Sequence, residues 1–145
     1  MAFVSPLPFM YRYTREAARK YVREYPILDG ITWRTVGDVD DCLTDLVCRV
    51  EVIAAQPHGR GPRQSAMHIR AMLHMSGPDG DVVAEASDAL IQAIEKAWGD
   101  GMITPEGWAT YIEWTQLSLP TFGSDSTADY INMATSLQVT ARKGA

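Results

Sequence analysis

Residues 66–75 alternate between a wholly apolar set of side chains and a set that includes His68, Arg70 and His74. A period of two places every second side chain on the same face, which predicts a β-strand with one buried face. The buried set would be the apolar members, Met67, Ile69, Ala71, Leu73 and Met75. Residues 43–54, 108–118 and 130–141 alternate in the same way. The chain is therefore expected to build a sheet of four strands.

Residues 82–98 carry a different period, that of an amphipathic α-helix. Their apolar stripe is Val83, Ala86, Leu90, Ala93, Ile94 and Ala97. Asp81 is the expected N-cap of this helix. A second helix is predicted over residues 14–25, with Thr14 as its cap and Pro26 ending it.

The loops between the strands complete the expected fold. Residues 56–64 and 119–128 are rich in glycine, proline and serine and would form long hairpin tips. The alternation slips near Leu137, which predicts a bulge. We expect an α+β fold: a mostly antiparallel four-stranded sheet of two long hairpins, with two helices packed on it in the order α-β-β-α-β-β. Residues 14–145 would form this single domain, and the apolar, proline-interrupted residues 1–13 an extended N-terminal arm.

Composition and charge exclude several classes of protein. The apolar runs of this 145-residue chain are far shorter than a membrane helix requires. The net charge of −5 argues against nonspecific nucleic-acid binding. Residues 1–28 hold five basic and two acidic side chains, whereas residues 78–113 hold eight acidic side chains and one basic one. This layout fits head-to-tail contact with a second copy, or ordinary solvated faces.

No motif in the sequence indicates catalysis or a cofactor. His68 and His74 share a strand face but are six residues apart, roughly 20 Å, too far to hold one ion together. Cys42 and Cys48 are as widely spaced if both lie in one extended segment, so a disulfide between them is not expected. A Gly-x-Ser-x-Gly elbow is absent. We therefore expect a protein that is not an enzyme and needs neither metal nor cofactor.

Two segments are expected to contact neighbouring subunits. The arm would expose apolar side chains unless it packed on something, and the first hairpin tip is basic. The candidate interface residues are Phe3, Phe9, Tyr11, His58, Arg60 and Arg63.

The layout of these elements resembles that of the tail terminator proteins of long-tailed bacteriophages. The matching parts are the basic N-terminal helix, the strand at 45–56 with its long tip, the return strand at 65–75, the helix at 82–98 and the polar C-terminal ending. The resemblance implies an α+β subunit of a ring, expected to be a hexamer, between the tail tube protein and a head-completion or connector protein. Genomic DNA would pass through its lumen without specific binding. The chain would be made in the host cytoplasm and reside in the virion, with no membrane partner.

Two alternatives remain open at the level of sequence. Another head–tail connector component or a tail tube protein would share this layout. A small α+β ligand-binding or enzymatic domain could instead use the strand face that carries His68, Arg70 and His74.

Overall fold

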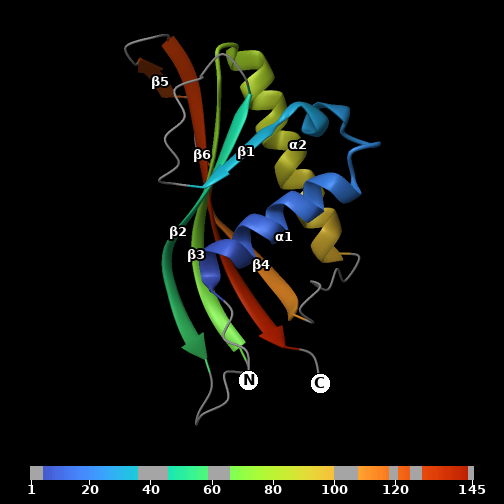
Figure 1. The fold of residues 1–145 in the computed structure, drawn as a ribbon, viewed down its shortest axis with the longest axis vertical. Helices are drawn as coiled ribbons and strands as arrows, with labels where there is room; N and C mark the ends of the chain where they lie inside the picture. The colour runs from blue at the N-terminus through green and yellow to red at the C-terminus, as the bar shows by residue number, and fades with distance from the viewer. Residues whose placement is uncertain are drawn as a thin grey trace.

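The computed structural model describes residues 5–35, 46–58, 66–99, 108–117, 121–124 and 129–143. Their elements follow one another as α1 (Pro6–Lys20), the 3-10 helix η1 (Pro26–Gly30), β1 (Thr32–Thr35), β2 (Val47–His58), β3 (Ala66–Gly77), α2 (Gly80–Gly99), β4 (Trp108–Leu117), β5 (Thr121–Ser124) and β6 (Asp129–Lys143). Figure 1 shows an elongated two-layer molecule, with the sheet on one side and both helices packed against its other side.

The strands form one mixed sheet in the order β1-β2-β3-β6-β4, and β5 also pairs with β6. Strand β6 is inserted between β3 and β4, which are its antiparallel neighbours. Among the described strands, only β1 and β2 pair in parallel. The C-terminal strand therefore completes the middle of the sheet.

The expected four-stranded antiparallel sheet and the order α-β-β-α-β-β are wrong. The sheet has two further strands, β1 and β5, each of four residues. Strands this short show too few alternations to be recognised from sequence. The parallel pairing of β1 with β2 was missed because parallel neighbours need a crossover connection, and no pattern in residues 29–41 indicates one.

The expected extended arm is wrong over residues 6–13, which are helical. Helix α1 begins at Pro6, eight residues before the expected start, and ends at Lys20 rather than near Tyr25. Pro6 and Pro8 lie in the first turn, where backbone N–H groups have no partner within the helix, so proline costs little there. Phe9, Met10 and Tyr13 are thereby turned into the core.

The core lies between the helices and one face of the sheet. All six residues of the apolar stripe expected on α2 are at most 2% exposed. The apolar face predicted for β3 is buried as well, and β6 contributes Leu137, Val139 and Ala141. The two periodic patterns therefore identified the surfaces that pack together.

An irregularity occurs at Leu137 as expected, in the pairing of β6 with β4, but the extra residue belongs to β4. Strand β6 pairs with β3 without a break, whereas its register with β4 shifts between Trp114 and Gln116. A second shift occurs in β2, between Val52 and Ala54.

The cap of α2 is Asp79 rather than the expected Asp81. The Asp79 Oδ1 atom accepts a hydrogen bond of 3.0 Å from the backbone N–H of Asp81, and the Asp79 carbonyl accepts one from Val83. We predict that Asp79→Ala lowers the free energy of unfolding by about 1 kcal/mol. Asp81→Ala is the matched control and should cost less, because it removes only a charge near the helix dipole. Urea denaturation measures both changes, and an equal loss would contradict this assignment.

Thr14, the expected cap of the first helix, lies inside α1. Its side chain is 0% exposed, and its hydroxyl has no hydrogen-bond partner among the described residues. We predict that Thr14→Val raises the free energy of unfolding by about 1 kcal/mol, because it removes a buried unpaired hydroxyl and fills the same space. Thr14→Ala, which also leaves a cavity, should not stabilise the fold. Loss of stability in the valine variant would show that the hydroxyl has a partner.

Candidate functional site

One face of the sheet is left uncovered by the helices, and we call it the open sheet face. The register places its side chains in rows across β2, β3, β6 and β4, for example Gln56, His68, Thr140 and Tyr111. The next row along the sheet contains Ala54, Arg70, Gln138 and Glu113. Its side chains are polar for the most part, as in antiparallel sheets with one face toward water or toward another surface.

The three residues of the alternative ligand-binding hypothesis all lie on the open sheet face. The His68 Nδ1 atom is 3.1 Å from the Thr140 hydroxyl, and the His74 Nε2 atom is 3.4 Å from Glu51 Oε1. Arg70 lies between the two histidines along β3 and is exposed. Both histidines are therefore engaged by neighbouring strands, and the structure does not bring the three side chains to one point.

A shallow hollow of about 160 Å³ lies in the middle of the open sheet face. It is lined by Ile53, Arg70, Ala71, Thr115, Ser136 and Leu137. Ile53 and Thr115 are the residues at the two register shifts, so a bulge on each side borders the hollow. The adjacent apolar residues Val52 and Ile53 break the alternation of β2, and this break is the sequence feature that could have indicated the bulge. Thr115 gives no such signal.

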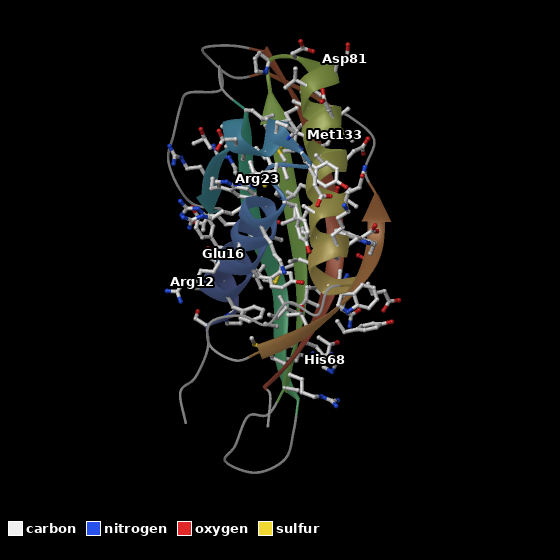
Figure 2. All side chains as sticks on the ribbon, turned by 90° about the vertical axis from the view of Figure 1, so that its right-hand side faces the viewer. Arg12, Glu16, Arg23, His68, Asp81 and Met133 are labelled. Carbon is white, nitrogen blue, oxygen red and sulfur yellow. The ribbon has the colours of Figure 1, made fainter. Side chains whose placement is uncertain are left out.

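The helix layer separates charges of opposite sign. The exposed basic side chains of α1 are Arg12, Arg15, Arg19 and Lys20, with Arg23 in the following turn. The exposed acidic side chains of α2 are Asp81, Glu85, Asp88 and Glu95. Figure 2 shows Arg12 and Glu16 on the flank of α1 that is turned away from α2.

Each helix also borders a hollow beside η1. On the α1 side, a hollow of about 310 Å³ has Arg15, Arg19 and Val22 in its lining, together with Asp29 and Trp33. On the α2 side, a cavity of about 320 Å³ is lined by three carboxylates, Glu24, Glu85 and Asp88, with Ile27 and other residues of η1 and α2. The first is mainly basic and the second acidic.

Lys96 joins α2 to the segment between α1 and η1 at the acidic side. Its ammonium donates a hydrogen bond to Glu24, which raises the pKa of Lys96, and it lies 5.5 Å from the centre of the Tyr25 ring. Glu95 accepts a 2.9 Å hydrogen bond from the Trp114 indole. Glu85 and Asp88 make no such side-chain contact within the part of the chain that the structure describes.

The predicted interface residues are scattered. Phe9 is 3% exposed and stacks on Tyr13, so its ring is not on the surface where we expected a contact. Tyr11 is partly exposed, beside the Arg15 guanidinium. His58 ends β2, but its side chain lies outside the described residues, as do Phe3, Arg60 and Arg63.

The described titratable groups with clearly perturbed pKa values include two in the core. Burial raises the pKa of the Cys48 thiol to about 12. Burial also raises the pKa of Tyr13, although a 2.9 Å hydrogen bond from the Thr110 hydroxyl opposes the shift. Across the described ranges, no three His, Cys, Asp or Glu side chains are placed to hold a metal ion. No helix there is long and apolar enough to cross a membrane.

Comparison with known proteins supports the fold and leaves the function open. The sequence matches no family of known proteins and no curated protein. One solved structure of a protein without a descriptive name is similar, with a TM-score of 0.50, 14% identity and 99% coverage of both chains. A chain from the virion of a native gene transfer agent particle has a TM-score of 0.42 and 9% identity, covering 88% of this chain and 93% of that one. The first likeness shows a shared fold, and the second is too distant to carry a functional argument.

The burial of Cys48 makes its thiol a probe of folding. In a Cys42→Ser background, we predict that DTNB at about pH 8 labels Cys48 only as fast as the protein unfolds, because the side chain is 0% exposed and stays protonated. Labelling in denaturant is the positive control. Rapid labelling in native buffer would contradict the burial.

The same shift predicts a dependence of stability on pH. An unfolded Cys48 releases its proton near 9.0, whereas the folded one does so only near 12. Its contribution to the free energy of unfolding is therefore complete below about pH 9 and is lost as the pH rises toward 12. Comparison with Cys48→Ala isolates this part of the pH profile.

Proposed function

We propose that the protein is a structural component of a phage virion that forms a ring, ends the tail tube and joins it to the head. The ring is expected to contain six copies of the chain. Its neighbours would be the tail tube protein and a head-completion or connector protein, with genomic DNA passing through the lumen. The resemblance of the sequence to tail terminator proteins is the source of this specific assignment.

The observation that carries the proposal is the exposed area that the fold leaves for neighbours. The long strands β2, β3 and β6 present one polar face that neither helix covers, and the helix layer presents charges of both signs. A subunit between two unlike neighbours and two copies of itself needs several distinct surfaces. A two-layer domain with an open sheet face provides several such surfaces.

We expect a phage that lacks this chain to make heads and tails that do not join. Electron microscopy of the lysate measures the fraction of joined particles, and wild-type chain supplied in trans should restore joining. Joined, infectious particles without the chain would overturn the proposal. Negative-stain images of the purified protein should show closed rings with a central hole.

The second candidate, a ligand-binding domain, is favoured by Arg70 at the hollow of the open sheet face. A thermal-shift screen with anions, nucleotides and divalent metals tests it. A ligand bound at this site would raise the melting temperature by mass action, and Arg70→Ala would abolish the shift. Glu113→Ala, which lies in the same row of the sheet, is the control. No shift with any ligand would eliminate this candidate.

A further inference from the structure

The exposed flanks of α1 and α2 carry complementary stripes of charge, which we call the basic stripe and the acidic stripe. The basic stripe is formed by Arg12, Arg15 and Arg19 and the acidic stripe by Asp81, Glu85 and Asp88. Residues three, four and seven positions apart lie on the same side of a helix, so each set forms a row, with Glu16 beside Arg19 in the basic one. Both rows extend over seven residue steps, about 10 Å of helix.

The spacing of the two stripes matches when the helices run antiparallel. The basic side chains follow at intervals of three and four residues, and the acidic ones at intervals of four and three. Turning one helix end to end brings Arg12 opposite Asp88, Arg15 opposite Glu85 and Arg19 opposite Asp81. Three pairs of opposite charge then share one register, whereas a parallel arrangement displaces the two central residues from each other by one position.

The two stripes cannot pair within one molecule. Figure 2 shows Arg12 on the flank of α1 that is turned away from α2 and Asp81 at the far end of α2. Glu85 and Asp88 are exposed and make no ion pair among the described residues. Arg19 contacts Glu16 at 3.7 Å, but this pair is largely exposed and can be exchanged at little cost.

Apolar surface lies beside each stripe, as a protein interface requires. Val22 and Trp33 line the hollow next to Arg15 and Arg19, and Ile27 lines the one next to Glu85 and Asp88. Charge pairs fix the register and orientation of a contact, and buried apolar groups supply much of its stability. Each hollow therefore adds apolar contact area to the stripe that it borders.

We propose that the basic stripe on α1 of one copy docks against the acidic stripe on α2 of a second copy, with the helices antiparallel. When the contact is repeated head to tail it generates a ring or a filament, whereas a two-fold dimer would pair both stripes of both copies with each other. The partner is a second copy of this chain. The inference rests on the proposed function, for which it identifies the surface between subunits.

Charge reversal at the central pair tests the contact. Analytical ultracentrifugation over a concentration series compares the wild type with Arg15→Glu and Glu85→Arg. Each single variant should self-associate at least about tenfold more weakly, since like charges then face each other. Mixing the two variants in equal amounts should restore assembly, because alternating copies place the introduced glutamate opposite the introduced arginine and the native Arg15 opposite the native Glu85. The double variant should assemble alone.

A control variant makes the same change of charge elsewhere on α1. Lys20→Glu lies off the basic stripe. It should assemble as the wild type does. Rescue on mixing also shows that both single variants are folded.

Several outcomes would overturn the inference. They are a wild type that stays monomeric, single variants that assemble normally, a mixture that does not recover, and an assembly that stops at two subunits. Head–tail joining in the phage is scored separately. If the chain assembles through these stripes but head–tail joining does not depend on it, the proposed function is refuted and the inference stands. If joining depends on the chain but the stripe variants assemble normally, the inference is refuted and the proposed function stands.

Discussion

The antiparallel pairing of β3 with β6 is the contact on which the rest of the domain depends. It runs without a break from the pair Ala66–Arg142 to the pair Gly77–Ile131. Strand β2 pairs with the outer edge of β3, β4 and β5 pair with β6, and α2 packs its apolar stripe across the central strands. Because β6 follows every other strand in the sequence, the centre of the sheet cannot form until residues 129–143 are available. Disruption of this pair would separate β2 from β4 and remove the surface on which α2 lies.

The sequence was sufficient to predict elements whose buried face has a long, regular period. The alternation in residues 66–75 identified the buried side of β3, and the stripe of α2 was predicted residue by residue. The short strands β1 and β5 were not predicted, because four residues are too few to show a period. The start of α1 was misplaced because Pro6 and Pro8 were interpreted as breaking a helix, although both occupy its first turn. For the short strands and for the start of α1, contacts with the rest of the fold determine the local structure, because the local sequence pattern is too weak to do so.

The candidate site was less predictable than the fold, for a physical reason. Packing constrains core residues, so they show a periodic apolar pattern in the sequence. Surface residues on different elements are brought together only by the topology of the fold. Arg15 and Glu85 are seventy positions apart, and each belongs to an ordinary solvated helix flank when considered alone. The uneven charge along the chain was visible, but its division between two neighbouring helices required the fold. The hollow between the bulges at Ile53 and Thr115 likewise depends on the register of four strands.

The separated charges on the helix layer determine how two copies of this chain attract or repel each other. The chain is acidic overall, so two copies repel at long range, and attraction depends on the basic stripe meeting the acidic one at short range. At physiological ionic strength the screening length is about 8 Å, which weakens the long-range repulsion but leaves close charge pairs largely intact. Moderate salt should therefore permit association and high salt should oppose it. An association driven by apolar contact alone would instead strengthen steadily as salt is added, so the salt profile separates the two kinds of contact without any substitution.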